Sequence, residues 1–179
     1  MSEACASFLS WVTVFLVWMA AGNDVRSRKI PNVLTVAGGA VGLIAHVWAS
    51  GVAGLETSGF GLGVGLALML PGYTLGSTGG GDVKLVAAVG ALLGPKGVLL
   101  AFACTMIAGA AIGAVYALVA RRTKGAALPF QRYGQMLRFF FTTGRPTYLP
   151  PGPEEALGQR LPFAVPIALG STLAALWTS

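Results

Sequence analysis

Residues 97–120 have the sequence GVLLAFACTMIAGAAIGAVYALVA, which is 24 positions without a charged side chain. An α-helix needs roughly 20 apolar residues to cross the hydrocarbon core of a bilayer. The rest of the chain has the same character: of 179 residues, 55% are hydrophobic and 10% are charged, against roughly 25% charged residues in an ordinary globular domain. Too few charges remain to cover a water-facing surface. We therefore predict an integral membrane protein.

Six apolar segments can be marked outward from that stretch, and each predicts a helix. Pro71 should kink or loosen the third segment near its end. The fourth follows a run of glycines and has only some 12 residues, so it must start or end inside the membrane thickness. Whether the fourth and fifth are two spans or one broken span stays open. We predict an all-α fold, a single domain over residues 1–179 with about six transmembrane helices, at about 6–22, 33–50, 59–76, 83–94, 97–120 and 161–178.

The net charge of +6 comes from 12 Lys and Arg against 6 Asp and Glu. In a soluble protein this balance would suggest nucleic acid, but here the basic residues gather between apolar segments, and we expect no nucleic-acid partner. Eleven of them follow the first, third or fifth segment, and only Lys96 lies on the other side. Because cytoplasmic loops carry the excess of Lys and Arg, the odd-numbered loops are predicted to face the cytoplasm, with both termini outside.

The long polar loop at 121–160 contains PFQRYGQMLRFFF at 129–141. Arg132, Gln135 and Arg138 recur at intervals of three, whereas Phe130 and Phe141 fall on the other side. This pattern predicts a short amphipathic helix in the cytoplasmic interface. It could be a plain anchor, or a gate or docking surface for a substrate. The following TGRPTYLPPGPEE is too rich in proline to be helical.

Other features carry less chemistry. Cys5 and Cys104 are far apart and form no CxxC pair, so we expect neither a disulfide framework nor a metal site, and no cofactor. The first 22 residues could pass for a signal peptide, but they include Glu3 and no Lys or Arg, so we expect no cleavage. His46 stands alone in the second segment and is expected to be a packed or interfacial residue rather than a ligand.

The chain has two aspartates in all, Asp24 and Asp82. Asp24 begins the polar break after the first segment, and Asp82 follows Gly79, Gly80 and Gly81 directly before the short fourth segment. The predicted topology puts both at the cytoplasmic edge. Ionisable groups at membrane depth are costly and are usually functional, so these two residues are the candidate site.

Two carboxylates on one side of a dry site suit an aspartic peptidase. Like charges within a few Å cannot both ionise, so the pair shares one proton. One carboxylate activates water and the other donates a proton to the peptide carbonyl. The glycines would let the backbone bend and approach a substrate strand. The alternative is structural: Asp24 as a helix-end residue and Asp82 as the N-cap of the fourth segment.

Three stretches resemble the type IV prepilin peptidase family, whose members are intramembrane aspartic peptidases of the GxGD type. They are DVRSRKIPN at 24–32, GGGDVKL at 79–85 and LPFAVPIALG at 161–170, in family order. The resemblance implies that Asp24 and Asp82 are catalytic and that Gly79, Gly80 and Gly81 shape the site. Lys84 could act on the carboxylates or contact the substrate, or it could be an interfacial lysine.

The resemblance further implies that the chain cuts the basic leader from prepilin-like precursors at the cytoplasmic face of the bacterial inner membrane. Longer family members carry an N-terminal region with paired CxxC zinc ligands and also methylate the new terminus. This chain has no CxxC, and its first segment starts near Ala6. We therefore expect a short form without that region, most like the tight-adherence (Flp) pilus leader peptidases. Methylation stays open, as do the oligomeric state and the precursor that is cut.

Two other classes of function stay open. A small transporter or channel could use the same two carboxylates to carry protons or cations, and a structural subunit of a membrane complex would need neither. Presenilin-like peptidases share GxGD, but their first aspartate typically follows a tyrosine, whereas Asp24 follows Asn23.

Overall fold

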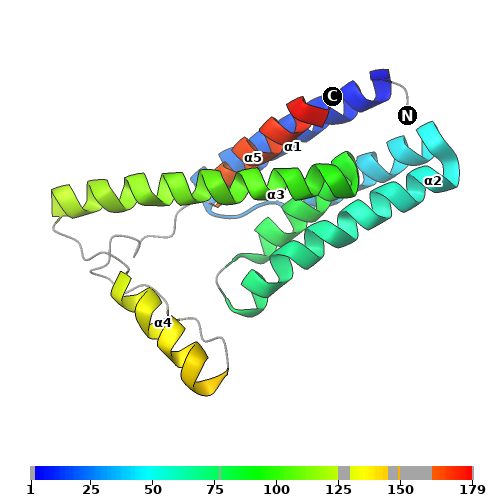
Figure 1. Ribbon diagram of the computed structural model, residues 1–179. Helices are drawn as coiled ribbons and strands as arrows, with labels where there is room; N and C mark the ends of the chain where they lie inside the picture. Colours follow the sequence, from blue (N-terminus) through cyan, green and yellow to red (C-terminus); the bar gives the residue numbers. More distant parts are fainter. Residues whose placement is uncertain (1–2, 77, 125–129, 145–148, 150–162, 179) are drawn as a thin grey trace.

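A computed structural model describes residues 3–76, 78–124, 130–144, 149 and 163–178, and every regular element in these ranges is an α-helix (Figure 1). The helices are α1 (Glu3–Ser27), α2 (Asn32–Thr74), α3 (Gly80–Lys124), α4 (Phe130–Thr143) and α5 (Ala164–Thr178). The all-α prediction is confirmed. Helix α1 is longer than the predicted first segment, and α2 continues three residues past Pro71 before it ends at Thr74.

Two of the helices are broken by glycines with positive φ. Helix α2 breaks at Gly51 (φ 58°, ψ −131°), and α3 breaks at Gly94 (φ 72°, ψ −178°). A residue with a Cβ rarely adopts such a φ. After Gly51 the chain turns back on itself, since Gly54 lies against the carbonyl of His46. The predicted gap at 51–58 between the second and third segments is wrong, because the helix resumes directly after Gly51.

Two backbone carbonyls beside the break in α3 form hydrogen bonds with side chains of α2. Pro95 has no N–H to offer the carbonyl of Ala91, and Ser58 donates to that carbonyl instead at 2.9 Å. His46 Nε2 forms a 3.1 Å hydrogen bond with the carbonyl of Leu92. Both side chains are buried. The prediction that His46 is a packed residue is confirmed.

Helices α2 and α3 cross at glycines. A Cβ at Gly61 would collide with the carbonyl of Gly90, and a Cβ at Gly90 would collide with that of Gly61. Gly65 also lies close to the backbone of Val86, although less so than Gly61 lies to Gly90. Small residues let two helices approach this closely in a membrane. Gly63 is different, because nothing lies within 4 Å of its Cβ position.

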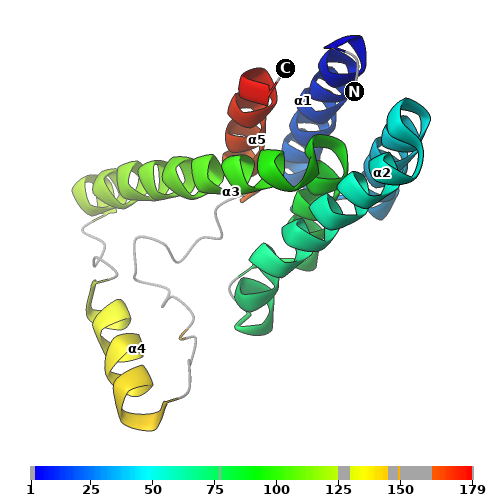
Figure 2. The same cartoon turned by 45° about the vertical axis from the view of Figure 1, so that its right-hand side comes forward.

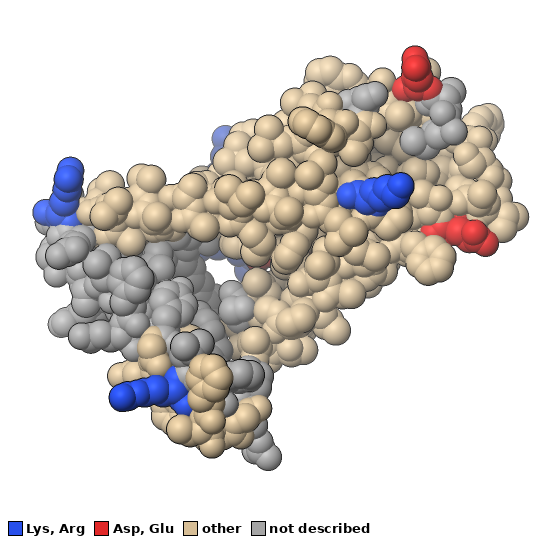
Figure 3. Space-filling view, viewed as in Figure 1, with Lys and Arg blue, Asp and Glu red and all other residues tan. Residues whose placement is uncertain are grey.

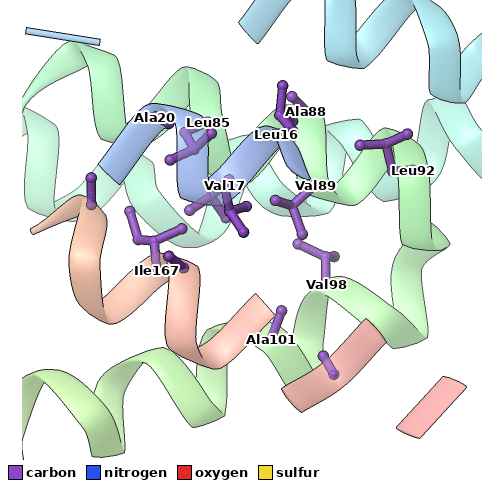
Figure 4. Packing of buried hydrophobic residues seen from close by; sticks show 14 of the residues in the cluster. Leu16, Val17, Ala20, Leu85, Ala88, Val89, Leu92, Val98, Ala101 and Ile167 are labelled. Atoms are coloured by element: carbon purple, nitrogen blue, oxygen red, sulfur yellow. The ribbon is translucent and has the colours of Figure 1, made fainter. Parts of the chain in front are cut away.

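The buried core lies between α1, α3 and α5. Figure 4 shows Val17 of α1 lying among Val89 of α3 and Ile167 of α5, and all three are essentially inaccessible. Helix α5 runs antiparallel to α1 and reaches it with a polar contact as well: Trp18 Nε1 donates to Thr172 Oγ1 at 3.2 Å. The core therefore fixes α5 against the two helices that carry the aspartates.

Large apolar side chains cover the outside of the bundle. Trp48 is 91% exposed and Trp177 85% exposed, and charged side chains are sparse on the face shown in Figure 3. Helices α1, α2 and α3 are long and apolar enough to cross a membrane, and α5 is a shorter apolar helix. These features indicate a membrane protein. The structure joins the predicted fourth and fifth segments into one bent element, α3, so six crossings with a separate short fourth helix stay a prediction.

Helix α4 stands apart from the bundle. Among the described helices it contacts none, and Figures 1 and 2 both show it away from α1, α2 and α5. Arg138, Phe139 and Phe141 are exposed on it. The predicted helix at this place exists, whereas its position in the membrane interface stays a prediction. Most of the proline-rich stretch after it lies outside the described residues.

Candidate active site

Asp24 lies in the last turn of α1. The turn that was predicted to be a polar break is helical, because its polar side chains bond to the helix backbone: Asn23 Nδ2 donates to the carbonyl of Met19 at 2.9 Å, and Ser27 Oγ to that of Asn23 at 2.8 Å. Arg28, with a φ of 53°, then ends the helix. Asp24 is half-buried, and its Oδ2 accepts a 3.4 Å hydrogen bond from the backbone N–H of Ala164, the first residue of α5.

Asp82 is the third residue of α3 and is also half-buried. Its Oδ2 accepts a 3.3 Å hydrogen bond from the backbone N–H of Gly79, just before the helix. A side chain in the first turn that reaches back to the residue before the helix is one half of a capping box. The alternative in which Asp82 is itself the N-cap is wrong, since α3 begins at Gly80.

The structure brings the two aspartates together. The charge of Asp24 acts on the carboxyl group of Asp82, and the two side chains come from the end of α1 and the start of α3. Each uses Oδ2 to accept one backbone N–H. In the described part of the chain, Oδ1 of each aspartate has no hydrogen-bond partner. Each carboxyl group is thus held by one oxygen and has the other free for water, substrate or a shared proton.

Two contacts hold the segment after Asp24 against the segment around Asp82. The side chain of Ile30 packs on Gly81, where an added Cβ would lie 3.2 Å from Ile30 Cβ. Lys84 Nζ donates a 2.9 Å hydrogen bond to Asn32 Oδ1 at the start of α2. Lys84 is exposed and, among the described residues, bonds to Asn32 rather than to either aspartate. This contact was absent from the sequence-based alternatives for Lys84.

The three glycines before Asp82 matter because they lack a side chain, and not because their backbone angles are unusual. None of them has a positive φ, which in this loop falls on Gly76 instead. A Cβ at Gly79 would lie 3.3 Å from Asp82 Oδ2, and one at Gly80 would lie 3.5 Å from Tyr73 Cε2. A side chain at Gly79 or Gly81 would therefore press on a neighbour, whereas the contact at Gly80 would be an ordinary one. None of the three adopts a positive φ, so the predicted bend is not seen at these positions, and their approach to a substrate strand stays a prediction.

Two features of the site escaped the sequence analysis. The Oγ1 atom of Thr78, one residue before Gly79, is buried and has no hydrogen-bond partner among the described residues. The N–H of Ala164 meets Asp24 from a position 140 residues away. No side-chain pattern could predict the second contact, because the donor is a backbone group.

A surface groove of about 510 Å³ lies elsewhere, on the outer face of α2. Its lining comes from that helix alone and includes neither aspartate, so it is not the candidate site; the lining residues are Glu56, Gly59, Phe60, Gly63, Val64 and Ala67. In the ranges that the structure describes, His, Cys, Asp and Glu nowhere gather in groups of three or more, and Cys5 and Cys104 are free thiols.

Comparison with known proteins gives two matches. The model of the type IV leader peptidase family matches residues 11–114, which include both aspartates. A prepilin leader peptidase/N-methyltransferase of Bacillus subtilis (strain 168) is 33% identical over 129 residues, covering 69% of this chain and 50% of that protein. The chain thus spans about half the length of this curated relative. No solved structure matches the chain.

Proposed function

Because the chain belongs to the type IV leader peptidase family, we propose that it is an aspartic endopeptidase that removes the basic leader from type IV prepilin-like precursors. The observation that carries this proposal is the pairing of Asp24 and Asp82. The two carboxyl groups are half-buried, and the charge of Asp24 acts on the carboxyl group of Asp82. Each accepts one backbone N–H through Oδ2, and among the described residues its Oδ1 has no hydrogen-bond partner.

The reaction needs one proton on the pair. The ionised carboxylate takes a proton from water as the water oxygen attacks the carbonyl carbon of the scissile peptide bond. The protonated carboxyl group gives its proton to the carbonyl oxygen, which forms a tetrahedral gem-diol. When the C–N bond breaks, the leaving nitrogen receives a proton from one carboxyl group, and a proton from the gem-diol returns to the pair. One water is consumed, and the pair ends with one proton as it began.

Helix lengths favour a site below the membrane surface. Asp82 is 12 residues from the break at Gly94, and at 1.5 Å per residue this first part of α3 rises about 18 Å. The hydrocarbon core is roughly 30 Å thick. If Gly94 lies at the outer boundary, Asp82 lies about 12 Å inside the inner one. Such a position suits cleavage beside the hydrophobic helix of a membrane-bound precursor.

Charge supports a cytoplasmic orientation. Arg26, Arg28 and Lys29 lie at the same end of the bundle as the aspartates, whereas Lys96 follows the break at Gly94. Cytoplasmic ends carry the excess of basic residues. We therefore place the site at the cytoplasmic side of the bacterial inner membrane, with the precursor and the lipid bilayer as partners, and α4 in the cytoplasmic interface.

The direct test is cleavage by the purified protein in detergent. A synthetic precursor with a basic leader and a following apolar segment is incubated with wild type, Asp24→Asn, Asp82→Asn and, as a matched control, Glu56→Gln. Glu56 is an exposed carboxylate on the outer face of α2. We expect wild type and E56Q to shorten the precursor and each Asn variant to lose at least about a thousandfold in rate.

Retention of cleavage by D82N would end the proposal. The transporter alternative makes the opposite prediction. It requires the protein to move charge or solute across liposomes in an aspartate-dependent way, and to leave the precursor intact. Because the cleavage assay contains no gradient, a positive result there supports the peptidase alone.

A further inference from the structure

Helix α5 begins beside Asp24. Its first residue, Ala164, is completely buried, and its N–H donates to Asp24 Oδ2 at 3.4 Å. The first N–H groups of a helix have no partner within the helix. They also lie at the positive end of the helix dipole, where a carboxylate is stabilised. Asp24 thus meets the start of a helix other than its own.

The sequence of the first turn of α5 limits which donors are available. Pro166 has no N–H, and the N–H of Ile167 donates to the carbonyl of Phe163 at 3.3 Å. Only Ala164 and Val165 are left with an N–H that the helix cannot use. Of these two residues, Ala164 is the fully buried one. Its N–H is therefore a single donor in a fixed place.

Packing fixes that place relative to both catalytic helices. Gly170 lies against the backbone of Ala101 and Thr105 in α3, where a Cβ would collide. On the other side, Trp18 of α1 bonds to Thr172 at 3.2 Å. Because α1 carries Asp24 and α3 carries Asp82, α5, like α2, touches both carriers of the pair. A shift of α5 would move the donor away from Asp24.

We propose that the backbone N–H of Ala164 positions Asp24 for catalysis by holding its Oδ2, so that Oδ1 is directed to water and the shared proton. The consequence for rate rests on the proposed peptidase function; the hydrogen bond itself does not. Ala164 is a positioning residue, acting through Asp24. It lies outside the residues 11–114 that match the family model.

The test uses the fact that Asp24 and Asp82 are the only aspartates in the chain. Labelling the protein with carboxyl-¹³C aspartate gives two side-chain resonances, which D24N and D82N assign. Ala164→Pro deletes the N–H, and proline is well accepted at the first position of a helix. Ala164→Gly keeps the N–H and serves as the conservative variant.

We expect A164P to move the Asp24 resonance by more than that of Asp82, which senses the change only through Asp24, whereas A164G leaves both in place. In the cleavage assay, kcat of A164P should fall about ten- to a hundredfold at unchanged KM, as for loss of a hydrogen bond to a charged group. The kcat of A164G should stay above that of A164P. An unmoved Asp24 resonance in A164P, or an equal shift in A164G, overturns the proposal.

A second measurement covers the case in which the proline ring prevents folding. In the wild-type chain labelled with ¹⁵N-alanine, the Ala164 amide is assigned by its loss in A164G. Its proton shift should change in D24N and stay the same in E56Q, and an unchanged shift in D24N would contradict the proposal. Neither spectrum requires cleavage. A chain that does not cut precursors but shows these shifts therefore refutes the peptidase and leaves the hydrogen bond standing.

Discussion

Lys84 of α3 donates a 2.9 Å hydrogen bond from Nζ to Oδ1 of Asn32, the first residue of α2. Asn32 ends the segment that begins at Asp24, and Lys84 lies two residues after Asp82. The bond therefore joins the two segments that carry the aspartates across 52 positions of sequence. This hydrogen bond and the packing of Ile30 on Gly81 are two contacts that keep the aspartates paired.

Loss of the hydrogen bond between Lys84 and Asn32 should lower activity while both aspartates stay in the protein. We expect Lys84→Met to reduce kcat about three- to tenfold, since a net hydrogen bond contributes about 0.5–1.5 kcal/mol. Asn32→Ala should have a similar effect, and the double variant should be no worse than either single one, because both remove the same bond. A rise in KM for K84M alone, with additive effects in the double variant, would instead indicate contact between Lys84 and the substrate.

The pairing of Asp24 with Asp82 could be predicted because it depends on side chains and on a count of apolar segments. Two aspartates in a chain so poor in charge stand out, and alternation of segments across a membrane puts them on one side. The break at Gly94 likewise coincides with the predicted end of the fourth segment at residue 94. These features are properties of residue types and their order, which the sequence displays directly.

Features that depend on which hydrogen bonds the polar groups form could not be predicted from the sequence. The polar break is predicted to begin directly after residue 22, yet Asn23 and Ser27 bond to their own helix and let α1 continue to Ser27. The predicted second segment ends at residue 50, next to the break at Gly51, but nothing in the sequence showed that the helix resumes at once and returns against itself. The contact between Ala164 and Asp24 involves a backbone donor, which every residue but proline possesses.

The glycines before Asp82 should differ in their tolerance of a side chain. At Gly81 an added Cβ would lie 3.2 Å from Ile30 Cβ, whereas at Gly80 its nearest neighbour is Tyr73 at 3.5 Å, an ordinary contact. We expect Gly81→Ala to reduce kcat/KM about tenfold or more, because a misplaced catalytic group is costly in rate. Gly80→Ala should retain most of the rate. Equal losses in the two variants would show that space beside Ile30 does not matter.

The crossing of α2 and α3 offers a matched pair for stability. A Cβ at Gly61 would collide with the carbonyl of Gly90, whereas Gly63, two residues on, has nothing within 4 Å. Gly61→Ala should lower the unfolding temperature in detergent, since overpacking costs about 1–3 kcal/mol. Gly63→Ala should leave it unchanged or raise it slightly, because alanine favours a helix over glycine by about 1 kcal/mol. A stable G61A protein would contradict the close crossing.

Thr78 supplies the last prediction. Its hydroxyl is buried and has no partner among the described residues, although the backbone N–H of Thr78 is held by the carbonyl of Gly72 at 3.2 Å. A buried polar group without a hydrogen bond costs about 1–3 kcal/mol. Thr78→Val keeps the shape and removes the hydroxyl, so we expect this variant to unfold at a higher temperature than the wild type.

Thr78→Val also tests whether the buried hydroxyl of Thr78, which lowers stability, contributes to cleavage. Thr78 precedes Gly79, whose N–H holds Asp82, so its hydroxyl lies next to the catalytic segment. If a bound precursor supplies the missing partner, T78V should combine higher stability with a several-fold lower kcat/KM, and Thr78→Ser should regain the rate. Thermal unfolding and cleavage of the same preparations separate the two effects. A T78V protein that unfolds at a lower temperature would show that the hydroxyl already has a partner in the free enzyme.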